Sequence, residues 1–191
     1  KDKNVMAAIP SIKIWKPNSI LKKIQFQEFF SAVFVRYVQS HLGSIPLAPG
    51  AFTLIRKTFI ETYGSLNPKT MVEDLEMSFR IQSEGYLIEN VIDANVYTSG
   101  VKTLKAFINQ RIRWFTGFFI QVNRYRHLFS RRYGNLGVFI LPVSLIYIFL
   151  TIFVFVYTII MIIYNSIKWI HELSLTGFDL ATMFEFNFEL F

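Results

Sequence analysis

Cysteine is absent from this chain of 191 residues, and charged side chains make up only 17% of it. Without cysteine there is no disulfide framework and no thiolate metal site. The scarcity of charge, a 52% hydrophobic content and a mean hydropathy of +0.36 disfavour an entirely soluble domain. The length is sufficient for a hydrophobic core, which excludes a disordered chain and a small disulfide-stapled one.

Acidic side chains are missing from residues 101–136, a stretch that carries eight basic ones. These are Lys102, Lys105, Arg111, Arg113, Arg124, Arg126, Arg131 and Arg132. A basic segment beside apolar sequence indicates binding to anionic lipid head groups or to a polyphosphate ligand. We expect no nucleic-acid partner, because no zinc finger, RNA-binding signature or DNA-reading helix pattern accompanies the charge.

Charge of either sign is missing from residues 133–167, a run of 35 residues. About 20 apolar residues cross a bilayer core, so the sequence predicts a transmembrane helix over residues 137–167. Arginines precede the run and acidic residues follow it, which places its N-terminal side in the cytoplasm. We expect an integral protein of the cell membrane in which residues 168–191 form an acidic tail or begin a further membrane segment.

The hydrophobic periodicity predicts an α/β fold. We expect a strand pair or a strand and loop over 5–15, a helix over 20–38, a short strand over 51–57, a helix over 71–84, strand structure over 86–98 and a helix over 103–129. Asn18 or Ser19 suits the cap of the first helix, and Gly85 suits the end of the second. The helix over 20–38 either packs on a core or lies on a membrane surface.

Three carboxylates, Glu73, Asp74 and Glu76, occupy the start of the helix over 71–84. Thr70 and Glu73 have the spacing of a capping box, in which Glu73 would bond back to the backbone and take no part in chemistry. Asp74 lies one residue further on, outside the cap position. A carboxylate held at a helix start is a candidate general base.

Polar residues share one face of the helix over 103–129: Gln110, Arg113, Trp114, Gly117, Gln121 and Arg124. This face is either solvated or a site that binds a diphosphate through guanidinium groups and stacks a sugar ring on Trp114. A third possibility is that Trp114 and Arg111 anchor the helix at a bilayer surface. The three histidines lack the spacing of metal ligands, so we expect no histidine metal site.

Two of these segments resemble the C-terminal signatures of the membrane-embedded family 2 glycosyltransferases, which include cellulose, chitin and hyaluronan synthases. The segments are VEDLEMSFRIQSEGY over 72–86 and QRIRW over 110–114. Pro49, Gly50 and Ala51, with Arg56, resemble the acceptor-side glycine segment that precedes them. The resemblance implies the C-terminal portion of a GT-A domain followed by interfacial and transmembrane helices. It also implies inverting transfer of a sugar from a nucleotide diphosphate, expected to be UDP, to a growing polysaccharide.

The resemblance assigns roles to individual residues. Asp74 is expected to be the catalytic base that deprotonates the acceptor hydroxyl. The donor diphosphate is expected to meet Arg113, Gln110 and Arg111. The acceptor is expected to meet Trp114, Gly50, Ala51 and Glu73. Val72 stands where many members have threonine, which is a mild departure that leaves the base in place.

A larger departure is that no D-x-D motif occurs in the sequence. In the family this motif binds a divalent metal, Mg or Mn, in an upstream donor-binding half. We therefore expect residues 1–100 to be the C-terminal part of the cytosolic catalytic domain, residues 101–136 to be a basic interfacial helix, and the chain alone to be inactive. The expected partners are a nucleotide-sugar donor, a polysaccharide or lipid-linked acceptor and membrane lipids.

Two alternatives remain open at this point. One is transfer of a single sugar to a lipid carrier. The other is a non-enzymatic, single-span membrane adaptor whose basic helix binds lipid.

Overall fold

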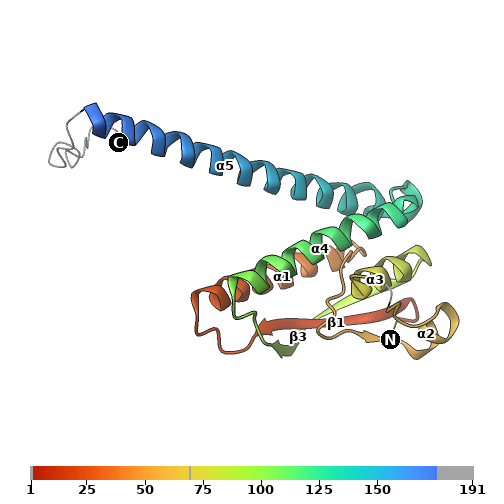
Figure 1. Cartoon of the computed structure of the whole chain (residues 1–191). Coiled ribbons are helices and arrows are strands. Elements are labelled where there is room, and N and C mark those ends of the chain that lie inside the picture. The colour runs from red at the N-terminus through yellow and green to blue at the C-terminus, as the bar shows by residue number, and fades with distance from the viewer. Residues whose placement is uncertain (1, 69, 176–191) are drawn as a thin grey trace. The chain divides into compact units, whose positions relative to one another are not determined.

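The computed structural model describes residues 2–68 and 70–175 (Figure 1). It divides into two compact units, residues 1–143 and residues 144–191. The elements in chain order are β1 (Val5–Ile14), α1 (Ile20–His41), β2 (Leu54–Ile55), α2 (Lys57–Tyr63), α3 (Glu73–Ser83), β3 (Leu87–Thr98), α4 (Leu104–Arg124) and α5 (Leu141–Leu175). Short 3-10 turns at Arg126–Leu128 and Arg131–Tyr133 and a π-helical turn at Leu136–Ile140 connect α4 to α5. The predicted α/β class is confirmed.

The sheet of the first unit has the strand order β2-β1-β3. β1 pairs with β3 in parallel, and Figure 1 shows these two long strands side by side. β2 pairs antiparallel with β1 through only two residues, Leu54 and Ile55. The chain then enters α2. This helix has only seven residues, too few to show a helical hydrophobic period in the sequence. Residues 5–14 thus form one strand, β1, and of the two alternatives the strand pair is wrong.

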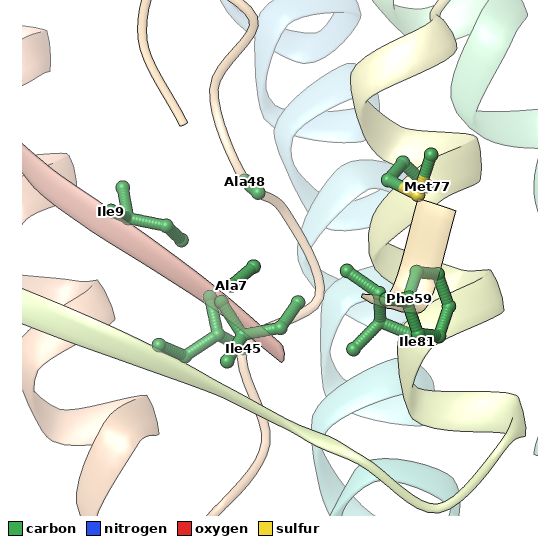
Figure 2. Packing of buried hydrophobic residues seen from close by; sticks show 8 residues of the cluster. Ala7, Ile9, Ile45, Ala48, Phe59, Met77 and Ile81 are labelled. Atoms are coloured by element: carbon green, nitrogen blue, oxygen red, sulfur yellow. The ribbon is translucent and has the colours of Figure 1, made fainter. Parts of the chain in front are cut away.

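The core of the sheet lies between β1 and α3 (Figure 2). Figure 2 shows Met77 and Ile81 of α3 and Phe59 of α2 opposite Ala7 and Ile9 of β1. Each large apolar side chain fully buried in this way stabilises the fold by about 1.5–3 kcal/mol. The loop before β2 adds Ile45 and Ala48 to the same core. This loop is therefore fixed against α3.

The helix starts differ in how they are capped. Ser19 accepts a hydrogen bond from the Lys22 N–H (3.3 Å) and begins α1, as predicted. Thr103 does the same for α4. The capping box expected at α3 is wrong, because Val72 occupies the cap position and the Thr70 hydroxyl donates to the Asn67 carbonyl instead. Glu73 is exposed as a result.

Helices α1 and α4 bury polar residues and expose apolar ones. The residues buried on α1 are Gln25 and Arg36, and those on α4 are Gly117 and Gln121. The exposed apolar residues include Ile24, Phe30, Phe34 and Val38 of α1, and Leu104, Ile108, Ile112, Phe115 and Phe119 of α4. Gly117 and Gln121 of the polar face of α4 are therefore turned toward the protein. Arg113 and Arg124 of the same face are exposed, so the face is only partly solvated.

The C-terminal helix is longer than the sequence predicts. Residues 136–175 form a helix long and apolar enough to cross a membrane, with a mean hydropathy of 2.8 over an 18-residue window. α4 ends at Arg124, five residues before the predicted end at 129, and α5 continues to Leu175. Residues 168–175 of the expected tail belong to α5, and residues 176–191 lie outside the described residues.

Candidate active site

Three side chains of α3 fasten the loop of residues 45–50 along the helix. The Gly50 N–H donates to Asp74 Oδ2 (2.8 Å), and the Ala48 N–H donates to Ser78 Oγ (2.8 Å). One turn further, Gln82 Nε2 donates to the Ile45 carbonyl (2.7 Å). Asp74, Ser78 and Gln82 are four residues apart and so share one helix face. The glycine segment is thereby held against the start of α3.

Asp74 is half-buried at the first turn of α3, and both of its oxygen atoms accept backbone hydrogen bonds. Oδ2 accepts from Gly50 and Oδ1 accepts from the Leu75 N–H (2.8 Å). An ionised carboxylate has about four acceptor positions. These two bonds therefore orient the Asp74 carboxylate. Its remaining lone pairs stay available to accept a proton from a ligand.

Gly50 lies too close to Asp74 to carry a side chain comfortably. A Cβ added there would stand 3.0 Å from Asp74 Oδ2 and 3.4 Å from its Cγ. The sequence did not predict this contact between the glycine segment and the carboxylate, and the expected contact of Gly50 with an acceptor stays a prediction. Ala51 follows at the surface. Arg56, just after β2, donates to the carbonyl of Val5 at the start of β1 and to the Asp2 carbonyl (2.9 Å).

The start of α3 crosses α4 at Gly117. A Cβ added to Gly117 would lie 2.4 Å from Cγ2 of Val72, so only glycine admits this crossing. Trp114, one turn earlier, is half-buried against an apolar cluster that includes Val72 and Leu75. Asp74 lies between these two residues in the sequence. Trp114 thus packs against residues of α3 that flank Asp74 in the sequence, and an approach of Trp114 to Asp74 stays a prediction.

The polar residues of the QRIRW segment have different surroundings. Gln110 Oε1 accepts from Gln25 Nε2 of α1 (3.4 Å), and Arg111 forms an ion pair with Glu28 of α1. Arg113 is exposed and makes no hydrogen bond or ion pair among the described residues. Of the two arginines, Arg113 is therefore the one free to meet an anionic ligand.

A pocket of about 390 Å³ opens beside the helix crossing. Its lining residues are Thr70, Met71, Gly117, Ile120, Gln121 and Arg124. Three of these, on α4, belong to the polar face predicted from the sequence. The pocket therefore lies along the same face of α4 as Trp114.

The sequence profile of the Glycosyl transferase family group 2 matches residues 5–171. The match covers nearly the whole chain and includes both motif segments. The chain belongs to this family. The resemblance inferred from the two motifs is therefore confirmed at the level of the family.

Curated relatives of this glycosyltransferase chain include two bacterial polysaccharide synthases. The poly-beta-1,6-N-acetyl-D-glucosamine synthase of Staphylococcus aureus is 28% identical over 117 residues, which is 61% of this chain and 28% of the relative. The enzyme of the same name from Staphylococcus epidermidis is 28% identical over 118 residues, or 61% of this chain and 29% of the relative. The chain spans less than a third of the length of these relatives.

A network behind the site involves glycosyltransferase residues whose role the sequence did not predict. Glu76, which is 2% exposed, accepts from the Tyr125 hydroxyl (2.6 Å) and forms an ion pair with Arg80. Arg80 also donates to the carbonyls of Tyr63, Gly64 and Ser65. The hydrogen bond with Glu76 raises the pKa of Arg80 above its usual value. Glu76 thus joins α3 to the end of α4 and to the loop after α2.

Burial first, and then the hydrogen bond to Glu76, raises the pKa of Tyr125 to about 12. The Tyr125 hydroxyl therefore keeps its proton and donates a hydrogen bond to the Glu76 carboxylate. The i, i+4 spacing of Glu76 and Arg80 is the one sequence feature from which their ion pair could have been predicted. Tyr125 lies 49 positions away and carries no such signal.

The described residues contain no group of three or more His, Asp or Glu side chains that could hold a metal ion. The divalent metal expected from the resemblance thus finds no ligand set in this part of the chain. Glu73 and Ala51, both expected to meet the acceptor, are exposed. Glu73 directly precedes Asp74 in the sequence, and Ala51 directly follows Gly50. Their contact with an acceptor stays a prediction.

Proposed function

We propose that this chain is the acceptor-side part of a membrane glycosyltransferase that moves a sugar from a nucleotide diphosphate to a growing polysaccharide. The observation that carries the proposal is the bond from the Gly50 N–H to Asp74 Oδ2. It joins two separate family segments around one carboxylate. Family membership and the printed activity of the relatives support sugar transfer as the reaction.

Asp74 is proposed to act as the general base. The acceptor hydroxyl oxygen attacks the anomeric carbon while the bond from that carbon to the diphosphate oxygen breaks. The hydroxyl proton passes to Asp74, and the electron pair of the broken bond leaves with the diphosphate. The fixed carboxylate supports this role, because a base must be held within hydrogen-bond reach of the proton that it removes.

Arg113 is proposed to neutralise the charge that grows on the leaving diphosphate, with Gln110 beside it. An exposed guanidinium without an internal partner is suited to this task, since it loses no existing ion pair on binding. Contact of Arg111 with the diphosphate stays a prediction, and the ion pair of Arg111 with Glu28 favours a different role.

Trp114, Gly50, Ala51 and Glu73 are proposed to form the acceptor side. The half-buried indole ring of Trp114 supports a stacking platform for a sugar ring. Gly50 lets the backbone come close to the carboxylate and leaves room for the acceptor. The divalent metal of the family has no ligand set among the described residues, so no step here uses it.

A polysaccharide acceptor is favoured over a lipid carrier by the relatives, whose names describe synthesis of a polymer. Their name also makes a nucleotide-linked N-acetylglucosamine the first donor to test. The adaptor alternative explains the basic segment and the apolar helix but not the carboxylate fastened to the glycine segment.

The membrane is proposed as the surface that covers α1 and α4. Their outward faces carry bulky apolar side chains, and the basic segment of residues 101–136 supplies charge for anionic head groups. The apolar helix that follows supports an integral membrane protein with the catalytic part in the cytoplasm.

The test is to incubate the purified full-length protein, in lipid, with a panel of UDP- and GDP-sugars and to analyse the products by size and solubility. The proposal expects one donor to give a long saccharide and the free nucleoside diphosphate. A single sugar on a lipid would favour the lipid-carrier alternative. Binding to lipid with no transfer from any donor would contradict the enzyme assignment.

A further inference from the structure

Helix α1 contacts two consecutive residues of the QRIRW segment. Gln25 of α1 donates to Gln110, and its Oε1 accepts from the Val101 N–H (2.9 Å) just before α4. Glu28, three residues later and on the same side of α1, pairs with Arg111. The first turns of α4 are thus held by long polar side chains of α1.

Arg111 lies between two aromatic rings. Its guanidinium carbon is 4.5 Å from the centre of the Trp114 ring and 4.4 Å from the centre of the Phe107 ring. Phe107, Arg111 and Trp114 recur at spacings of four and three and so share a helix face. The Arg111 side chain is only 23% exposed, and its Nε is buried without a hydrogen-bond partner.

We propose that Arg111 is a positioning residue that fixes the ring of Trp114, and that Glu28 orients Arg111 for this purpose. The inference rests on the proposed function, in which Trp114 is the acceptor platform. It gives the two arginines of the segment separate tasks, because Arg113 faces outward without a partner while Arg111 is engaged inside. It also means that Glu28 of α1, 83 residues before Arg111 in the sequence, helps to position the site.

The geometry matters more here than the charge. Glu28 is 40% exposed, and an ion pair at such a position stabilises a protein by only about 0–1 kcal/mol. A planar guanidinium over an indole face, however, restricts how the ring tilts and attracts it electrostatically. A lysine at 111 keeps the charge but presents no flat surface to the ring. The main consequence is therefore the orientation of Trp114, not the stability of the fold.

The test uses four variants of the full-length enzyme: Glu28→Gln, Arg111→Lys, Arg111→Gln, and the exchange Glu28→Arg with Arg111→Glu. The exchange restores an ion pair between α1 and α4 but puts a carboxylate beside Trp114. We measure the KM for a short saccharide acceptor, the KM for the donor and the thermal midpoint. The matched control is Arg131→Gln, which removes a positive charge from the same basic segment at an exposed position.

All four variants should raise the acceptor KM, by roughly three- to tenfold for Arg111→Gln and for the exchange, and less for Arg111→Lys and Glu28→Gln. The donor KM and the thermal midpoint of the exchange should stay near wild type, and the control should change neither KM. If the exchange restored the acceptor KM, Arg111 would be a structural bridge only and the inference would be wrong. An increase confined to the donor KM would instead place Arg111 at the diphosphate and also overturn it.

A second readout does not depend on turnover. Incorporation of 5-fluorotryptophan gives a fluorine resonance for Trp114, assigned by its loss in Trp114→Phe. We expect this resonance to shift or broaden in Arg111→Gln and in the exchange, and to stay in place in Arg131→Gln. An unchanged resonance would contradict the positioning role even if the proposed sugar transfer failed, and a shifted resonance in a protein without transferase activity would contradict only the proposed function.

Discussion

Asp74 owes its fixed orientation to backbone N–H groups from two parts of the chain, Gly50 and Leu75. The sequence predicted Asp74 as the base and Gly50 as an acceptor residue from their motifs, but not the hydrogen bond between them. It did not predict Ser78 or Gln82, which complete the fastening of the loop. A buried serine or glutamine on a helix looks like a surface residue until its backbone partner is known. Only the fold supplies that partner, because the paired positions are 30 and 37 residues apart.

The close approach at Gly50 predicts the effect of Gly50→Ala. The added methyl would stand 3.0 Å from Asp74 Oδ2, so the carboxylate must move or lose its bond to the Gly50 N–H. A displacement of this kind in a catalytic group lowers turnover by roughly tenfold to a hundredfold. Steady-state kinetics of the full-length enzyme check this expectation.

A suitable control is Gly134→Ala, where an added Cβ meets nothing within 4 Å. Gly134 has a φ of 53°, so its replacement strains the backbone and lowers stability by roughly 1–3 kcal/mol without touching the site. Similar turnover in both variants would mean that the contact between Gly50 and Asp74 has no catalytic consequence.

The exposed guanidinium of Arg113 predicts a strong effect of Arg113→Lys and Arg113→Ala. Losing one preorganised contact with a developing charge typically lowers the rate by about a hundredfold, and lysine cannot reproduce the two-pronged geometry. Membrane association should change little, because seven other basic residues remain in the segment of residues 101–136. Full sugar transfer by Arg113→Lys, measured beside vesicle flotation, would show that this helix does not meet the diphosphate.

At the scale of elements, the sequence located the long helices well but gave their orientation only in part. The periodicity of α1 and α4 separates an apolar from a polar face, yet it does not say which face meets the protein. In the fold Gln25 of α1 and Gln121 of α4 are buried, and bulky apolar residues of both helices are exposed. Arg113 and Arg124 of the polar face of α4 stay exposed. A surface helix of a soluble protein instead turns its apolar face to the core and its polar face to water. Helix α2 was not predicted, since seven residues contain too few turns to show a period.

The buried hydroxyl of Tyr125 predicts a pH dependence of stability. Its folded pKa is raised to about 12, above the value near 10 of an unfolded tyrosine. The folded state therefore retains this proton more tightly, and the associated stability is fully present below pH 10 and lost as the pH rises toward 12. Tyr125→Phe should remove this phase of the curve. Thermal unfolding between pH 8 and 12 checks it, and an identical alkaline decline in both proteins would contradict the assignment.

At the scale of the whole molecule, the outward apolar faces of α1 and α4 predict contact with the lipid bilayer. The chain lacks cysteine, so single cysteines can be introduced as probes after replacement of any cysteine elsewhere in the full-length protein. In reconstituted enzyme, Ile112→Cys should be protected from a water-soluble maleimide and labelled by a reagent confined to the bilayer. Lys57→Cys, on an 88% exposed side chain of α2, is the control and should show the reverse. Equal labelling of both positions from water would exclude an interfacial α4.

The central claim is that Asp74, held by the Gly50 N–H, is the base for sugar transfer. The most direct measurement compares turnover and donor binding in wild-type and Asp74→Asn forms of the full-length enzyme in lipid. The amide keeps the size of the side chain but cannot take the acceptor proton. We predict that Asp74→Asn abolishes transfer while expression and donor affinity stay near wild type. Turnover close to wild type would contradict the account, because it would mean that Asp74 is only a carboxylate at a helix start.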